Sequence, residues 1–552
     1  MPETHEGRPH AAWHAEYHVV ARTNPVIAAF VACFKSVLGY LTLPVYFILH
    51  SLYVFVQGIF IRMFKPRPPP EKIKHPYARI AVIGGGLTGV SSAAHAVSHG
   101  FEVVLYEAAD RIGGIWAHEN KTSGLQLNSL LYRFHPAVCW KKAFPQRDEI
   151  LGEIEKVWKE YRLEERTRLN TPVRQVKQVK RASPDDECQG NPLEQLTSGL
   201  PSQWYINAGE DGPFDALIGL VEKHEQWTYQ GPVLHSSQLD YATPEVLHNK
   251  TVAVIGSGAS GVEAVETVLA RGVDRCIMFA RQDKVRNVIF DVFLSAQPFG
   301  REMPFSVAWE QFLALWQYHG VEDLVPRRGL FVSTPVVNDD FLNHVRSGKF
   351  RLTTNGIVVD VRESIECGSP LGIGKGVHEC IRPTGSDSER SGAAPESEGH
   401  VEFKADVVIL ATGYKRPSLS FLPQELFPKD YERPRLYLQN FSTEDWSVLL
   451  TNSAYLNAIG TVDTRILLTF LLDPTTRPTA KDMKLWVDII RFIKRGAQGG
   501  ALGFFTYMEL MIWIVTFHIL RPDRWRWSSF ILFGWDVSPD DERLVSLVHE
   551  GK

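Results

Sequence analysis

The chain has 552 residues, and its 59 lysines and arginines against 63 aspartates and glutamates leave a formal net charge of −4. This length allows a large buried core and predicts two or three domains. The near balance of charge gives no reason to expect a nucleic-acid partner. The six cysteines include no CxxC pair and no zinc-ligand spacing, and the histidines are scattered, so we predict no metal site.

An uncharged segment at residues 36–61 comes first along the chain, within an N-terminal extension that we place at residues 1–75. It is long enough to cross a bilayer, whose core requires about 20 apolar residues. Arg62, Lys65 and Arg67 follow it at once, and this excess of basic residues predicts that the rest of the chain faces the cytosol. Because the segment contains proline, histidine and glutamine, a buried hairpin or a membrane-surface helix is the alternative.

A glycine-rich loop with Gly84, Gly86 and Gly89 follows the apolar run 79–83 and precedes a stretch of small and apolar residues. This is the strand, turn and helix order of a dinucleotide-binding unit. A second predicted strand ends at Glu107, whose carboxylate would accept hydrogen bonds from ribose hydroxyls. The cofactor contacts predicted from this unit are Gly84, Gly85, Gly86, Leu87, Thr88, Gly89 and Glu107.

A second loop repeats the pattern with Gly256, Gly258 and Gly261, between an apolar strand at 251–255 and a helix-like stretch. Its next strand ends at Arg281, where the first unit has an acid. A guanidinium there can pair bidentately with a 2′-phosphate, so we predict NADP rather than NAD in this unit. The alternative for Arg281 is a solvated charge at the end of a strand.

The missing cysteine pair narrows the classes of protein that bind two dinucleotides. A pyridine nucleotide disulfide reductase needs a redox pair near its flavin, and the sequence contains no CxxC. The same cysteine usage predicts a reducing compartment for most of the chain.

Four further segments stand in a fixed order along the chain. They are GGIW at 113–116, YQGPVLH at 229–235, GSGASG at 256–261 and ATGY at 411–414. Together they resemble the class B flavin monooxygenases, which comprise flavin-containing monooxygenases and their Baeyer-Villiger relatives. The resemblance implies FAD and NADPH as cofactors. It adds Gly114, Ile115, Trp116, Ser260, Thr412 and Gly413 to the predicted cofactor contacts.

The second of these segments departs from the family's FxGxxxH signature. Tyr229 replaces its phenylalanine, and Leu239 stands where the family has an aromatic residue. Baeyer-Villiger members usually carry a tryptophan at this point. The difference favours flavin-containing monooxygenases over ester-forming enzymes, although the reaction type depends on how the pocket positions a substrate rather than on one motif.

The resemblance also implies residues close to the flavin. Asn128 falls where the family has an asparagine whose amide reaches the flavin and nicotinamide, so we predict it as catalytic, with Ser129 as a neighbouring cofactor contact. An ordinary turn asparagine is the alternative. His235 corresponds to the signature histidine, which is a linker residue in the family, and we assign it no proton transfer. In the family's mechanism NADPH reduces the flavin, which then carries oxygen as a C4a-hydroperoxyflavin.

We therefore predict an α/β protein with two Rossmann-like dinucleotide-binding domains and hydrophobic, membrane-associated termini. The NADP domain, at residues 249–401, is expected to be inserted within an FAD domain formed by residues 76–248 and 402–495. A hydrophobic, tryptophan-rich segment at 496–552 completes the chain.

That C-terminal segment contains a second long apolar stretch at 497–520, in which Glu509 is the only acid. Arginines interleaved with tryptophans follow it, as is typical of a membrane interface. Because a charge in mid-segment is costly in lipid, we expect this end to lie on or dip into the membrane. An ordinary core helix is the alternative. The two ends together predict a protein anchored in a membrane, that of the endoplasmic reticulum, with cytosolic catalytic domains.

The predicted activity is the insertion of one oxygen atom from O2 into a small, lipophilic organic substrate, with consumption of NADPH. One alternative is a Baeyer-Villiger or epoxidising monooxygenase of a secondary-metabolite pathway. The other is a non-oxygenating NADPH-flavin reductase or dinucleotide-binding protein. The anchored form and the polar insertions resemble monooxygenases of fungal biosynthetic pathways.

Overall fold

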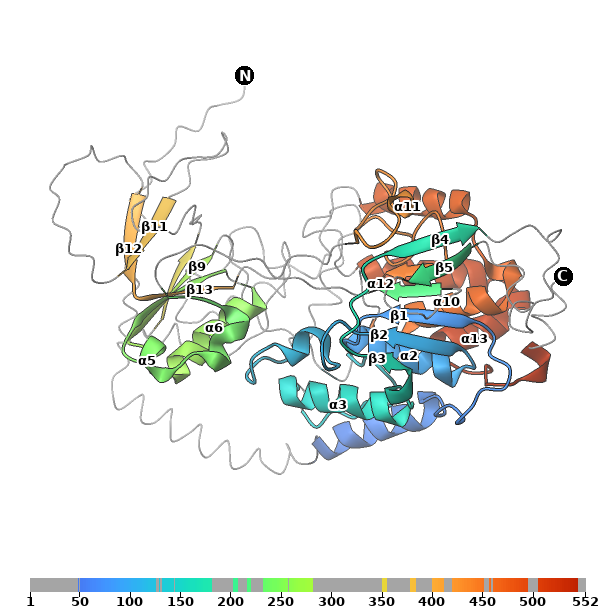
Figure 1. The fold of residues 1–552 in the computed structure, drawn as a ribbon, viewed down its shortest axis with the longest axis horizontal. Coiled ribbons are helices and arrows are strands. Elements are labelled where there is room, and N and C mark those ends of the chain that lie inside the picture. Colours follow the sequence, from blue (N-terminus) through green and yellow to red (C-terminus); the bar gives the residue numbers. More distant parts are fainter. Residues whose placement is uncertain are drawn as a thin grey trace, which may run out of the picture.

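Two parallel β-sheets, each followed by helices, organise the chain (Figure 1). The computed structural model describes residues 48, 50–125, 129, 132–142, 144–180, 202–206, 216–219, 232–256, 258–280, 350–354, 378–383, 400–411, 419–450, 456–457, 460–494 and 505–544.

The first sheet has five parallel strands in the order β14-β6-β1-β2-β3. They are β1 (Arg79–Ile83), β2 (Glu102–Tyr106), β3 (Thr167–Arg168), β6 (Ala216–Gly219) and β14 (Val448–Leu450). Along β1, Ile80 and Val82 face one buried cluster while Ala81 and Ile83 face another. Since both faces of the strand are covered, a continuous apolar run is what this position requires.

Helix α2 (Leu87–Ser98) follows the first glycine loop and packs on β1 and β2. Its alanines and serines are almost entirely buried, because it lies between the sheet and two further helices, α3 (Arg147–Glu160) and α10 (Val462–Leu472). Small side chains allow this close packing on several sides. The predicted order of strand, loop, helix and second strand is therefore present.

The second sheet also has five parallel strands, in the order β10-β9-β8-β13-β7. They are β7 (Val233–His235), β8 (Thr251–Ile255), β9 (Arg275–Ala280), β10 (Phe350–Thr354) and β13 (Val407–Leu410). Helix α6 (Ala259–Ala270) follows the second glycine loop and packs on β8 and β9.

The strand pairings move the expected domain boundaries outward. β7 and β13 both pair within the second sheet, although we had assigned residues up to 248 and from 402 to the first domain. The insertion itself agrees with the prediction, because β14 rejoins the first sheet after the second sheet is complete. Sequence patterns locate strands, but the choice of sheet depends on long-range hydrogen bonding.

Smaller elements decorate the two sheets. Three two-stranded sheets pair β4 (Val176–Lys180) with β5 (Ser202–Ile206), β11 (His378–Pro383) with β12 (His400–Ala405), and β15 (Leu456–Asn457) with β16 (Gly460–Thr461). Short helices include η1 (Gly114–Ala117), η3 (Ser236–Tyr241) and α5 (Pro244–Leu247).

The C-terminal helices α11 (Ala480–Lys494), α12 (Phe505–Ile514) and α13 (Trp525–Phe533) belong to the first unit (Figure 1). Leu510, Trp513 and Ile514 enter its core, while Met511 and Ile512 are exposed. Buried Glu509 accepts hydrogen bonds from Gln439 Nε2 at 2.8 Å and Trp486 Nε1 at 3.2 Å. The acid in the apolar stretch is thus satisfied by protein, as in the core-helix alternative.

A helix over residues 50–64 precedes the first sheet and lies along α3 (Figure 1). An ion pair between Lys65 and Glu160 and a hydrogen bond of 2.8 Å from Tyr161 Oη to the Pro66 carbonyl hold its C-terminal end. Most of residues 36–49 fall outside the described ranges. Within those ranges, none of the helices combines the length and the apolar character that a bilayer crossing demands.

Candidate dinucleotide-binding sites

The first glycine loop connects β1 to α2 at the carboxyl end of the sheet. Gly84 adopts a φ of 104°, which favours glycine, and its N–H donates to the carbonyl of Tyr106 at 2.7 Å. A Cβ atom added to Gly89 would lie 1.9 Å from the Gly84 carbonyl oxygen. Any side chain there would separate the helix from the strand. The loop therefore directs the N-terminus of α2 to the edge of the sheet where such folds bind phosphates.

Glu107, the acid after β2, lies directly against this loop. Its Oε2 accepts a hydrogen bond from the Gly85 N–H at 2.5 Å, and its Oε1 accepts one from the Ala109 N–H at 2.8 Å. The residue is only 9% exposed. These two bonds fix the carboxylate beside the glycines, where a ribose joined to the bound pyrophosphate can reach it.

The segment at 113–116 passes over the same loop. The Gly113 N–H donates to the Gly85 carbonyl at 2.9 Å, and a Cβ added to Gly114 would lie 2.9 Å from the Gly86 Cα. Gly114 begins η1, whose Trp116 packs partly buried against the main core. Two backbones thus meet at glycines and leave a cradle free of side chains. This arrangement fits the diphosphate of FAD, and it unites three of the predicted segments.

The second loop has the same geometry. Gly256 has a φ of 113° and donates its N–H to the Phe279 carbonyl at 3.0 Å. A Cβ on Gly261 would lie 2.1 Å from the Gly256 carbonyl oxygen, whereas one on Gly258 would meet no atom of the described residues within 4 Å. The exposed backbone at Gly258 is therefore open to an approaching phosphate. Ser260, in the first turn of α6, is partly buried beside it. These features fit the predicted NADP.

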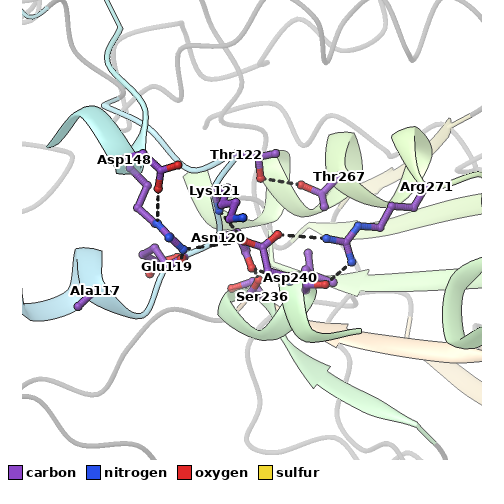
Figure 2. Close-up of polar contacts among 12 residues, drawn as sticks. Ala117, Glu119, Asn120, Lys121, Thr122, Asp148, Ser236, Asp240, Thr267 and Arg271 are labelled. Carbon is purple, nitrogen blue, oxygen red and sulfur yellow. Dashed lines mark hydrogen bonds and ion pairs between the residues drawn. The ribbon is translucent and has the colours of Figure 1, made fainter. Parts of the chain in front are cut away.

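A network of polar contacts joins the two dinucleotide units (Figure 2). Asn120, from the loop after η1, is 4% exposed; its Nδ2 donates to the Ser236 carbonyl at 2.6 Å and its Oδ1 accepts from the Asp240 N–H at 3.1 Å. In return, Asp240 Oδ2 accepts from the Lys121 N–H at 2.7 Å. The hydroxyls of Thr122 and Thr267 lie 3.1 Å apart. Residues 120–122, which follow the glycine segment of the first unit, thus form hydrogen bonds with η3 and α6 of the second unit.

Two arginines flank Asp240 from opposite sides of this contact. Arg271, at the end of α6, places Nη2 3.1 Å from Asp240 Oδ1. Arg147, at the start of α3, donates to the Glu119 carbonyl at 2.8 Å and lies 4.0 Å from Asp240 Oδ2. Since these groups are partly exposed, we expect each ion pair alone to contribute little, and the network to set orientation.

His235 caps η3 rather than facing either loop. Its Nδ1 lies 2.8 Å from Ser237 Oγ, and its N–H donates to Gln238 Oε1 at 2.9 Å. The ring therefore fixes the short helix that carries Asp240. Leu239 is fully buried in the core of the second unit, while Tyr241 is 77% exposed and does not take its place.

Four predicted site residues fall outside the described ranges: Asn128, Arg281, Thr412 and Gly413. The roles proposed for them remain predictions. Ser129 is described and fully buried, and its hydroxyl donates to the Lys142 carbonyl at 2.8 Å and bonds with Tyr53 Oη at 2.5 Å. Its side chain is thus engaged by protein groups.

The network across the units was missed by sequence reasoning. Asn120, Arg147, Asp240 and Arg271 belong to no glycine motif, although Asn120 closely follows the segment 113–116 and Asp240 closely follows the segment 229–235. Cys276 lies buried on β9, and this burial raises the pKa of its thiol. The cysteine therefore behaves as an apolar residue. Among the described residues, no cluster of His, Cys, Asp and Glu has metal-binding geometry.

The comparisons with known proteins agree with this arrangement. A family model described as an NAD(P)-binding Rossmann-like domain matches residues 82–143, which include the first loop, Glu107 and Asn120. The chain is 29% identical over 213 residues to a Baeyer-Villiger monooxygenase of Pseudomonas aeruginosa, covering 37% of each chain. It is 23% identical over 403 residues to flavin-containing monooxygenase 5 of Oryctolagus cuniculus, covering 65% of this chain and 68% of that protein.

A third relative is the FAD-binding monooxygenase lolF1 of Epichloe uncinata, 26% identical over 198 residues and 34% of each chain. The matches thus span about a third of the Pseudomonas and Epichloe proteins and about two thirds of the Oryctolagus protein. All three are monooxygenases, and both branches of the predicted family are represented. The resemblance found in the motifs is confirmed, but the preference for one branch is not decided by these relatives.

Solved structures share the fold. A cyclohexanone monooxygenase with bound epsilon-caprolactone aligns with a TM-score of 0.52 and 16% identity, over 79% of this chain and 98% of that one. An oxidised steroid monooxygenase bound to NADP aligns with a TM-score of 0.53 and 14% identity, over 79% and 97%. The chain therefore shares the fold of these monooxygenases.

Proposed function

We propose that this chain is an FAD- and NADPH-dependent monooxygenase that inserts one oxygen atom from O2 into a small organic substrate. The observation that carries the proposal is the continuous path from one glycine loop to the other. Gly113 and Gly114 contact the first loop. Asn120, six residues after Gly114, forms hydrogen bonds with the second unit. A single short segment thus couples two nucleotide sites.

Each described residue has a defined task in this proposal. The loop from Gly84 to Gly89 and the N-terminus of α2 bind the FAD diphosphate, and Glu107 orients its ribose. Gly258 and the N-terminus of α6 bind the NADPH diphosphate. Asn120 and Asp240 hold the two units in register, so that the nicotinamide and the flavin can be presented to each other.

The bound flavin would supply the redox chemistry, by accepting hydride from NADPH and activating oxygen. The protein supplies position, electrostatics and exclusion of water, which explains why a nucleophile with an adjacent base is not needed. Arg281 is the residue that we propose for selection of NADPH over NADH, and Asn128 the one for the flavin and nicotinamide region.

The test is oxygen transfer by the purified full-length chain. We expect a bound yellow flavin, oxygen uptake that requires NADPH, and a product that carries one 18O atom from 18O2. Amines, thioethers and ketones as substrates separate N- or S-oxygenation from Baeyer-Villiger ester formation, which the Pseudomonas relative's name makes the second candidate. NADPH oxidation with full recovery of reduced oxygen species, and no labelled product from any substrate, would instead indicate a reductase.

We also infer that the enzyme works at a membrane, with its catalytic units on the cytosolic side and the endoplasmic reticulum as the site. Support comes from the uncharged segment 36–61, the basic residues after it and the many exposed apolar side chains of the C-terminal helices. A lipophilic substrate fits this location. We also propose a role in a secondary-metabolite pathway, which the uncharged N-terminal segment and the polar insertions of the sequence support.

A further inference from the structure

The helix over residues 50–64 packs on the first unit through the side that carries Tyr53, Gln57 and Phe64. Gln57 is fully buried: its Nε2 donates to the Trp140 carbonyl at 2.8 Å, and its Oε1 accepts from the Trp140 N–H at 2.9 Å. One turn earlier, Tyr53 Oη bonds with Ser129 Oγ at 2.5 Å. Because these hydrogen bonds involve side chains and backbone of the body of the protein, this face of the helix is fixed to it.

The opposite side of the same helix is apolar and exposed. Its large side chains recur every three or four residues, which places them in one stripe. They are Ile48 (64% exposed), Leu52 (54%), Phe55 (64%), Ile59 (43%) and Met63 (51%). A helix on a protein surface in water normally carries polar residues on its exposed side. We call these five residues the outward stripe.

We propose that the outward stripe lies in the surface layer of a lipid bilayer, with the helix parallel to the membrane plane. This inference rests on the membrane association proposed above and specifies the surface that makes the contact. It also changes the anchor expected at 36–61. Since Gln57 is held by Trp140, the part of that segment from residue 50 onward lies on the membrane instead of crossing it.

The chemistry around the stripe favours lipid over a protein partner. A protein interface combines apolar contacts with hydrogen-bonding groups, whereas the stripe offers only aliphatic, aromatic and thioether groups. The segment 36–61, which contains all of the stripe except Met63, has no Asp, Glu, Lys or Arg. Arg62 and Arg67, just beyond it, are exposed and can meet anionic headgroups.

A partly exposed aromatic residue lies beside the C-terminal end of the helix. Trp535 is 41% exposed, and its indole N–H donates to the Met63 carbonyl at 3.0 Å. Phe64 stacks on the ring of Trp535 with centroids 6.0 Å apart. A half-exposed tryptophan beside an apolar stripe suits the boundary between headgroups and acyl chains, where one edge of the ring stays polar.

Photocrosslinking tests the contact in the full chain. Benzoylphenylalanine replaces Phe55 or Ile59 by codon suppression, and the variants are reconstituted in vesicles of phosphatidylcholine and phosphatidylserine that contain a clickable phospholipid. The same amino acid at Tyr241, an exposed aromatic position on the second unit, is the matched control. Retention of yellow flavin shows that each variant is folded, and flotation of the vesicles reports membrane association separately.

We expect lipid adducts at residues 55 and 59 and none at residue 241. Adducts between residue 55 and another part of the same chain, or to a second copy, would overturn the proposal, as would absence of any lipid adduct in protein that floats with the vesicles. Protein that does not float at all would refute the membrane association as well. Neither result depends on monooxygenase activity, so the proposed chemistry is judged separately.

Discussion

Asn120 and Asp240 form a reciprocal contact between the two dinucleotide units (Figure 2). The Asp240 N–H donates to Asn120 Oδ1 at 3.1 Å, and the Asp240 carboxylate accepts from the N–H of Lys121, the residue after Asn120, at 2.7 Å. The Asn120 amide also donates to the Ser236 carbonyl. The Asn120 side chain is therefore hydrogen-bonded to the backbone of the second unit, and the Asp240 side chain to the backbone of the first. Together these bonds fix the distance and the orientation between the two units.

Replacement of Asn120 by alanine tests this role. It removes two hydrogen bonds of a buried side chain, which contribute about 1 kcal/mol each. We therefore expect NADPH to reduce the flavin roughly tenfold more slowly, because the two units lose their relative orientation. Anaerobic stopped-flow absorbance measures this rate. Tyr241→Ala, which changes an exposed side chain beside Asp240, is the control and should leave the rate unchanged. Equal rates in both variants would show that the contact does not position the cofactors.

The glycine loops and their strands could be predicted from sequence because each depends on local geometry. At Gly89 and Gly261 a side chain would collide with the carbonyl oxygen of the glycine five residues earlier in the same loop. Glu107 is placed by strand β2, which it directly follows. The interdomain contact could not be predicted in this way. Asn120 and Asp240 are far apart in sequence, and ordinary polar residues acquire a role only when two sheets are placed side by side.

The terminal segments show a second limit of sequence reasoning. Hydropathy alone does not say which face of an apolar helix meets protein. Gln57 weakened the prediction of a membrane span, and it proves to be the buried attachment point of the helix. Glu509 suggested a segment at the membrane surface, yet it is paired with Gln439 and Trp486 inside the protein. In both cases the partner comes from a distant part of the chain.

Glu107→Gln is predicted to weaken FAD binding. The amide keeps the shape of the side chain but loses the negative charge. That charge strengthens the hydrogen bond that Glu107 accepts from the Gly85 N–H, and would strengthen those from the ribose hydroxyls. Hydrogen bonds to a charged group contribute about 1.5–3 kcal/mol, so the Kd for FAD should rise by roughly tenfold or more. Fluorescence titration of flavin-depleted protein measures it. The control is Glu102→Gln, at the other end of β2, where the carboxylate pairs with Arg79. If the two variants bind FAD equally well, Glu107 is not a ligand.

Alanine at two glycines of the second loop separates folding from cofactor binding. At Gly261 the new Cβ would lie 2.1 Å from a carbonyl oxygen, so Gly261→Ala should lower thermal stability of the protein, by about 1–3 kcal/mol of overpacking strain. At Gly258 it would meet no atom within 4 Å in the part of the chain that the structure describes, so Gly258→Ala should leave the melting temperature unchanged.

Because Gly258 is nevertheless the point where a phosphate would approach, we expect Gly258→Ala to raise the Kd for NADPH. Differential scanning fluorimetry and isothermal titration calorimetry measure the two effects. Unchanged NADPH affinity in a stable Gly258→Ala protein would place the nucleotide elsewhere.

Three buried histidines predict how stability depends on pH. Burial lowers the pKa of His95 well below its usual value and that of His99 to about 4, and burial likewise lowers the pKa of His135. The rings of His95 and His135 lie 4.6 Å apart. The folded state keeps these rings neutral, whereas the unfolded chain protonates them near pH 6.5. Unfolding therefore takes up protons below that pH, and stability should fall as the pH drops from about 6.5 towards 4, by about 1.4 kcal/mol per pH unit for each histidine.

His95→Leu isolates one contribution to this dependence. Among the described residues, neither ring nitrogen of His95 has a hydrogen-bond partner, so an apolar side chain of similar size should be tolerated. We expect the variant to lose less stability than the parent chain between about pH 7.5 and about pH 5.5. Thermal unfolding at both values measures the difference, with His118→Gln, an exposed position, as the control. Equal losses in the parent, His95→Leu and His118→Gln would mean that carboxylates, not the buried histidines, govern acid sensitivity.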